Sequence, residues 1–102
     1  EKSMTIVLCT KGYPGKYKKN LEIKNLGNLN LFVKDFIYHA GTKLKGDEIL
    51  SNGGRVLNIT SIGNNFLKIR KRIISIIHKL NWKSGFFRKD IGYKVINKNA
   101  NN

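Results

Sequence analysis

Only one stretch of this chain has the spacing of an amphipathic helix, and this restricts the folds that the chain can adopt. Between Phe66 and Leu80, apolar residues recur every three or four positions, behind a capping residue at Asn64 or Asn65. The other apolar segments are short, rich in β-branched or aromatic residues, and separated by glycine-containing turns. Because only one connection is long enough to carry a helix, the sequence predicts mainly antiparallel strand pairing.

The predicted fold class is α+β, with a small, mainly antiparallel, barrel-sandwich-like sheet and one long amphipathic helix packed on it. The expected strands cover residues 4–9, 21–26, 36–40 and 55–62, a hairpin of 42–45 and 48–51, and one or two short pieces within 86–96. The 102 residues form a single domain, and residues 97–102 are expected to be a frayed tail.

The predicted helix has about 15 residues and an apolar stripe that faces the sheet. The stripe consists of Phe66, Ile69, Ile73, Ile76, Ile77 and Leu80, and Leu67 and Ile74 widen it. Lysine and arginine fill much of the opposite side of the helix, so that side is expected to face solvent.

The formal net charge is +14, from 20 Lys and Arg against 6 Asp and Glu, and such a charge is typical of proteins that bind nucleic acid. However, Lys outnumbers Arg by 16 to 4 while Asn and Ile each number 13, which is the profile of an AT-rich coding sequence. The densest basic stretches, 16–19 and 68–72, lie on different predicted elements. We therefore expect a solvated basic surface rather than a nucleic-acid partner, with a free-standing basic nucleic-acid-binding module as the alternative function.

The sequence contains no complete catalytic or metal-binding set. His39 and His78 have no partner at metal-ligand spacing, and the adjacent acids Asp47 and Glu48 fall in a predicted turn. The single cysteine, Cys9, lies in an apolar run and is expected to be a buried thiol, which fits the reducing cytoplasm. No apolar run approaches the roughly 18 to 20 residues that cross a bilayer, so no membrane partner is expected. We predict no catalytic residue and no metal ligand in this chain.

Two glycine-containing segments have the composition of an anion-binding site. Asn52-Gly53-Gly54 precedes Arg55, so backbone amides and a guanidinium could approach one phosphate closely. If the segment 39–43 is a neighbour in the sheet, Thr42 and Lys43 could join the same site. The alternative interpretation is an ordinary hairpin loop that carries exposed cations.

Five sequence motifs follow one another between Gly12 and Gly92. They are Gly12-Tyr13-Pro14-Gly15-x-Tyr17, His39-Ala40-Gly41-Thr42, Ser51-Asn52-Gly53-Gly54-Arg55-Val56-Leu57, Thr60-x-x-Gly63 and Phe87-Arg88-Lys89-Asp90-Ile91-Gly92. Their order and approximate spacing resemble the C-terminal domain of the phosphoribosylamine–glycine ligase family, over roughly residues 5–96.

The resemblance implies an ATP-grasp, ATP-dependent carbon–nitrogen ligase of purine biosynthesis. In that family, glycine is activated as glycyl phosphate and attacked by the amine of 5-phosphoribosylamine, which gives glycinamide ribonucleotide, ADP and phosphate. It also implies that ATP and Mg²⁺ (or Mn²⁺) bind outside this chain, to the N-terminal and ATP-grasp domains that are its partners. The enzyme is expected to be cytoplasmic, and this chain alone is expected to be inactive.

The resemblance also assigns candidate site residues. The phosphate of 5-phosphoribosylamine is expected to contact Lys43, Asn52, Gly53, Gly54 and Arg55. Two interpretations stay open for Arg88, Lys89 and Asp90: they position substrate, or Asp90 pairs with Arg88 or a neighbour and holds the terminal segment in place. Tyr13 and Tyr17, beside the Pro14 loop, are interpreted as packing residues.

Overall fold

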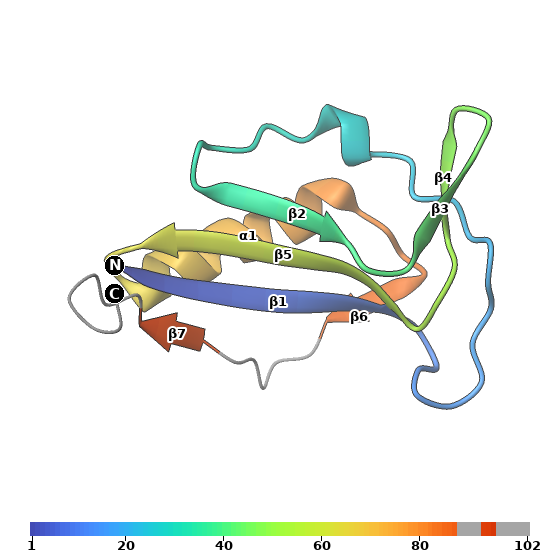
Figure 1. Ribbon diagram of the computed structural model, residues 1–102, viewed down its shortest axis with the longest axis horizontal. Coiled ribbons are helices and arrows are strands. Elements are labelled where there is room, and N and C mark those ends of the chain that lie inside the picture. Colours follow the sequence, from blue (N-terminus) through green and yellow to red (C-terminus); the bar gives the residue numbers. More distant parts are fainter. Residues whose placement is uncertain (88–92, 96–102) are drawn as a thin grey trace.

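A computed structural model describes residues 1–87 and 93–95, and shows an antiparallel sheet with one long helix on one face (Figure 1). The strands are β1 (Lys2–Thr10), β2 (Asp35–His39), β3 (Thr42–Lys45), β4 (Glu48–Ser51), β5 (Arg55–Gly63), β6 (Gly85–Phe87) and β7 (Tyr93–Val95). The helices are the 3₁₀ turn η1 (Leu26–Asn28) and α1 (Phe66–Leu80). The expected tail, residues 97–102, lies outside the described residues.

The strand order of the main sheet is β2-β5-β1-β6, and β7 also pairs with β1. All of these pairings are antiparallel. The β3–β4 hairpin forms a second, two-stranded sheet, which stands across one end of the main sheet (Figure 1). The α+β class, the antiparallel pairing and the hairpin are therefore confirmed.

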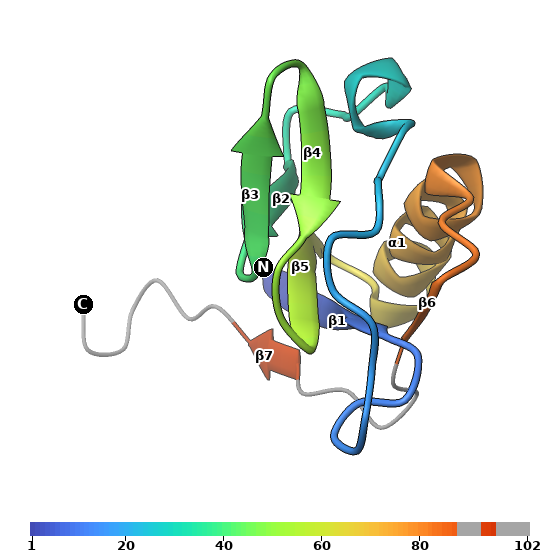
Figure 2. The same ribbon diagram turned by 90° about the vertical axis from the view of Figure 1, so that its right-hand side faces the viewer.

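The two faces of the main sheet differ because side chains alternate along β1 and β5. Ile6 and Ile59 are paired across the two strands, and both are fully buried in the core beneath α1. Their neighbours Thr5 and Thr60 are paired on the opposite face, where their hydroxyl oxygens lie 2.7 Å apart. Figure 2 shows α1 on one side of the sheet only.

Helix α1 is capped at both ends by asparagines. The side chain of Asn65 accepts a hydrogen bond from the Lys68 amide at 3.1 Å, which confirms one of the two predicted caps. Asn81 adopts the left-handed conformation at φ 48°, and its amide donates to the carbonyl of Ile77. These caps satisfy backbone groups that a helix end otherwise leaves unpaired.

The apolar stripe of α1 is confirmed with one exception. Ile69, Ile73, Ile76 and Leu80 are buried, and Phe66, Ile74 and Ile77 are partly buried against the core. Leu67 is 71% exposed, so its assignment to the stripe was wrong. The reason is geometric, because Leu67 precedes Ile69 by two residues and a helix turns by about 100° per residue.

A buried ion pair ties α1 to β2 and β5. The carboxylate of Asp35 accepts hydrogen bonds from Nε and Nη2 of Arg72, at 3.2 and 3.0 Å, and from the hydroxyl of Ser61 at 2.6 Å. Its second oxygen accepts from the amide of Phe32 at 3.1 Å. Because Asp35 is 6% exposed, these donors replace the water that its charge has lost.

Residues 21–26 do not form the predicted strand. They contact the hairpin through one isolated bridge, Glu22 to Leu50, and the Ile23 amide donates to the Ile49 carbonyl at 2.9 Å. The predicted alternation still places Ile23 inward, where it is 3% exposed. The segment therefore buries the expected side chain and lies beside β4, but its pairing with residues 49–51 is too short to form a strand.

Candidate functional site

The loop between β4 and β5 meets the loop that follows β1 at one end of the main sheet (Figure 1). Thr10, the last residue of β1, donates from its amide to the Gly54 carbonyl at 2.8 Å. The hydroxyl of the same threonine donates to the Gly53 carbonyl at 3.0 Å. These two bonds hold the glycine pair against β1, and its two carbonyls are both engaged.

The turn between β2 and β3 contacts the same loop. The amide of Asn52 donates to the carbonyl of Gly41 at 2.7 Å. A Cβ atom on Gly41 would overlap the carbonyl oxygen of Arg55, so only glycine allows this close approach of the two backbones. The structure thus confirms that the segments around Gly41 and Gly53 are neighbours, although they lie apart in the sequence.

The side chain of Tyr13 covers the loop. A Cβ atom on Gly54 would overlap the Tyr13 ring, so the glycine there is required by packing within the chain. The hydroxyl of Tyr13 accepts a hydrogen bond from Nε of Arg55 at 3.3 Å. Tyr17 packs edge-on against the ring of Tyr13, with 6.0 Å between the ring centroids. The interpretation of both tyrosines as packing residues is confirmed, and Tyr13 has a polar contact in addition.

Arg55 is the exposed cation of this cluster. It is the first residue of β5, and no carboxylate among the described residues forms an ion pair with it. Gly53 is half-buried, and its amide has no hydrogen-bond acceptor within the part of the chain that the structure describes. A guanidinium and a backbone amide without an acceptor are donors that suit phosphate or carboxylate.

Lys43 belongs to a different hollow. It lies on β3 and lines a cavity of about 320 Å³ together with His39, Thr42, Leu44 and Ile49. In this cavity, Nδ1 of His39 and the hydroxyl of Thr42 are 2.8 Å apart. Of the predicted phosphate-binding residues, the structure brings Asn52, Gly53, Gly54 and Arg55 together, and it places Lys43 on the neighbouring hairpin.

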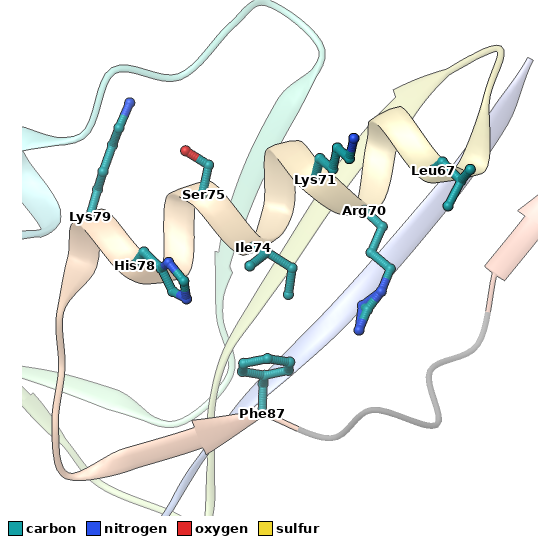
Figure 3. Close-up of a pocket in the computed structure, with 8 residues that line it drawn as sticks. All are labelled: Leu67, Arg70, Lys71, Ile74, Ser75, His78, Lys79 and Phe87. Atoms are coloured by element: carbon teal, nitrogen blue, oxygen red, sulfur yellow. The ribbon is translucent and has the colours of Figure 1, made fainter.

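A larger hollow, of about 710 Å³, runs along the outer side of α1 beside β6 (Figure 3). It is lined by Leu67, Arg70, Lys71, Ile74, Ser75, His78, Lys79 and Phe87. Arg70, Ile74 and His78 follow one another at a spacing of four on the side nearer to Phe87 (Figure 3). Sequence reasoning expected this side of the helix to be a solvated surface and did not identify a groove in it.

The described residues offer no metal centre. No three His, Cys, Asp or Glu side chains among them are placed to hold one ion. Cys9 is buried, as predicted, and the described part of the chain has no helix long and apolar enough to span a membrane. Arg88, Lys89 and Asp90 lie outside the described residues.

Thr10 and Tyr13 are the site residues that sequence reasoning missed. Each contacts the glycine pair from more than 40 positions away in the sequence, and no local pattern links such positions. The one available signal was indirect: two adjacent glycines leave room for a large neighbour, and the aromatic loop after β1 supplies one.

Comparison with known proteins extends over nearly the whole chain. The family model for the phosphoribosylglycinamide synthetase C domain matches residues 3–94. The phosphoribosylamine–glycine ligase of Agrobacterium fabrum is 40% identical over 94 residues, which cover 92% of this chain and 22% of that enzyme. The chloroplastic phosphoribosylamine–glycine ligase of Arabidopsis thaliana is 37% identical over 98 residues, 94% of this chain and 18% of the relative.

A third relative is the trifunctional purine biosynthetic protein adenosine-3 of Gallus gallus. It is 37% identical over 94 residues, which cover 92% of this chain and 9% of that protein. The chain therefore spans less than a quarter of the length of these curated relatives, from 22% of the first to 9% of the third.

Proposed function

The chain belongs to the phosphoribosylglycinamide synthetase C-domain family, and we propose that it is the C-terminal domain of a phosphoribosylamine–glycine ligase. The proposed enzyme joins glycine to 5-phosphoribosylamine in purine biosynthesis, and converts ATP to ADP and phosphate as it forms glycinamide ribonucleotide. The observation that carries this proposal is the family match over residues 3–94. The names and identities of the ligase relatives support it.

We assign ATP and its Mg²⁺ or Mn²⁺ to parts of the enzyme outside this chain. Nucleotide-bound divalent cations are held by carboxylates, and the described residues contain no cluster of such ligands. The buried carboxylate of Asp35 already accepts hydrogen bonds from Arg72 and Ser61. The purified chain of 102 residues should therefore release no ADP when it is given ATP, glycine and 5-phosphoribosylamine. Turnover that exceeds a buffer blank and survives repurification would contradict this assignment.

The partners of this domain are the N-terminal and ATP-grasp domains of the same enzyme, and its small-molecule partner is 5-phosphoribosylamine. The relatives support the first part, because in each of them the matched segment is a minor share of a longer polypeptide. We place the enzyme in the cytoplasm, although the family is not confined there, since the Arabidopsis relative is named as chloroplastic.

The contribution of this domain to the active site is to bind the phosphate of 5-phosphoribosylamine through the loop of Asn52, Gly53, Gly54 and Arg55. Arg55 supplies an exposed guanidinium without a carboxylate partner among the described residues, and Gly53 supplies an amide. Gly54 supports the loop by admitting the Tyr13 ring. Lys43 adds positive charge from the neighbouring hairpin, so its removal is expected to have a smaller effect than that of Arg55.

Substitution of Arg55 in the full ligase tests this role. A charge-assisted hydrogen bond contributes about 1.5 to 3 kcal/mol, so Arg55→Ala should raise the KM for 5-phosphoribosylamine by roughly 10- to 150-fold. The KM values for ATP and glycine should change little, because the phosphate of 5-phosphoribosylamine is remote from its reacting amine. Arg55→Lys should recover only part of the loss, because an ammonium cannot form the two-pronged contact of a guanidinium.

The matched control is Arg70→Ala, which removes the same charge from the outer side of α1. It should leave the KM for 5-phosphoribosylamine within about twofold of the parent value, since exposed charges separated by more than a Debye length of about 8 Å are largely screened. Equal KM values in folded Arg55→Ala enzyme and parent enzyme would reject the phosphate role. Such a result would leave Arg55 as a surface cation.

A further inference from the structure

The side chain of Tyr13 contacts both the loop of Gly53 and Gly54 and the cation that follows it. Its ring occupies the space that a side chain on Gly54 would need, and its hydroxyl accepts from Nε of Arg55 at 3.3 Å. We propose that Tyr13 is a positioning residue for Arg55, which holds the guanidinium in the orientation that receives a phosphate. This inference rests on the proposed function, in which Arg55 binds the phosphate of 5-phosphoribosylamine.

Because Tyr13 contacts Nε of Arg55, it determines which N–H donors of the guanidinium remain available to a ligand. A guanidinium has five N–H groups, of which one is on Nε and four are on the two terminal nitrogens. The tyrosine hydroxyl takes the Nε donor and leaves the terminal pair unoccupied among the described residues. Two parallel N–H groups from that pair match two oxygens of one phosphate. The contact therefore selects an end-on approach of the anion to Arg55.

Tyr13 is itself held from several sides, so it can orient the exposed side chain of Arg55. Its amide donates to the Thr10 carbonyl at 3.1 Å, and its ring packs edge-on against Tyr17. Gly12, just before it, has φ +100° and lies against the Lys16 backbone, a conformation and a spacing that only glycine fits easily. These contacts close the loop on itself and hold the Tyr13 ring against Gly54, next to the start of β5.

Arg55 needs such a contact because no other side-chain hydrogen bond or ion pair to a described residue restrains it. The side chain is exposed and has no ion-pair partner among the described residues. A long exposed side chain loses rotamer freedom when it binds, and this loss weakens affinity. A hydrogen bond to a fixed hydroxyl removes part of that freedom before the ligand arrives. The expected consequence is tighter binding of the phosphate with no effect on the chemical step.

The test is Tyr13→Phe in the full ligase, which removes the hydroxyl and keeps the ring that covers Gly54. At 3.3 Å the bond is long, so we expect the effect of one neutral acceptor, a rise of roughly 2- to 10-fold in the KM for 5-phosphoribosylamine. The kcat value and the KM values for ATP and glycine should stay unchanged. Tyr17→Phe is the matched control, since it removes a hydroxyl from the packing partner, and it should leave all of these constants at the parent value.

A double-mutant cycle separates positioning from folding. In an Arg55→Ala background, Tyr13→Phe has no guanidinium to orient, so the expected change in KM is less than about twofold. A loss through folding would appear equally in both backgrounds and would overturn the inference, as would an unchanged KM for Tyr13→Phe in the parent background. If Arg55→Ala itself leaves the KM unchanged, the proposed phosphate role fails. If Arg55→Ala raises the KM and Tyr13→Phe does not, only the positioning role fails.

Discussion

The glycine-rich end of the sheet and the outer groove of α1 both present positive charge, but they are built differently. At the sheet end, one cation, Arg55, is fixed by Tyr13 above a loop that β1 holds through two hydrogen bonds. In the groove, Arg70, Lys71 and Lys79 line an open hollow, and no hydrogen bond or ion pair to a described residue restrains them. The sheet end therefore has fewer cations than the groove, but its cation and its loop are held by hydrogen bonds within the chain.

Charge density alone does not make a binding site. An anion site must hold its donors at fixed distances and angles, because immobilising free side chains reduces the affinity gained from their charge. The groove has three such side chains and the charge that favours nonspecific contact with polyanions. The sheet end has the backbone constraints that favour a specific contact, and for that reason we place the substrate phosphate there.

Substitution of the arginines on α1 should give the largest difference in stability, because Arg72 is paired with a buried carboxylate and, among the described residues, Arg70 is not. Arg72→Ala leaves Asp35, whose side chain is 2% exposed, as a buried charge without its cation. Loss of one partner of a buried pair costs about 3 to 5 kcal/mol, and the lower end is expected because Arg72 is 32% exposed. Urea unfolding of the isolated domain measures this cost. Arg70→Ala, two positions earlier, is the control and should change the free energy of unfolding by less than about 0.5 kcal/mol. Equal losses would show that the groove cation is also fixed.

The inner side of α1 should respond almost as strongly. Ile73 is fully buried between α1 and the sheet, so Ile73→Ala should lower the free energy of unfolding by about 2 to 4 kcal/mol. Leu67→Ala is the control, because Leu67 is 71% exposed and leaves no cavity when it is shortened. A loss below roughly 0.5 kcal/mol for Ile73→Ala would mean that the face of the helix is assigned wrongly.

The difference between Gly54 and Gly53 tests the order of the loop more directly. Gly54→Ala places a methyl group into the Tyr13 ring and should cost about 1 to 3 kcal/mol, the range of overpacking. Gly53→Ala meets nothing closer than the Arg55 carbonyl oxygen, at 3.7 Å, and should be tolerated within about 0.5 kcal/mol. Thermal unfolding of the two variants measures the contrast. Similar melting temperatures would indicate that the Tyr13 ring moves aside at no cost, which would weaken the case for a fixed loop.

Local patterns predicted the elements of this fold better than the contacts between them. The helix from Asn65 and the hairpin around Gly46 are encoded by neighbouring residues, and both were predicted. The alternation in residues 21–26 predicted the burial of Ile23, but it does not specify how many bonds an extended segment makes, so the strand was wrong. The loop before Arg55 was found from its glycines and cation. Its constraint by Tyr13 joins positions 42 apart, and tertiary structure alone brings them together.

The smallest change in the free energy of unfolding is expected for the groove of α1. The KM of a groove variant shows whether the groove or the loop before Arg55 binds the phosphate. Arg70→Gln with Lys71→Gln removes two cations that line the hollow. Arg70 and Lys71 follow the first turn of α1, and the dipole effect on charges falls off within that turn, so the double variant should change the free energy of unfolding by no more than a few tenths of a kcal/mol. The KM for 5-phosphoribosylamine in the full ligase should stay within about twofold of the parent value. Elution from a heparin column should move to lower salt, because fewer cations remain for a nonspecific polyanion contact. A KM that rises as far as in Arg55→Ala would instead place the phosphate site at the groove cations, and would show that fixed donor geometry does not determine where the phosphate binds.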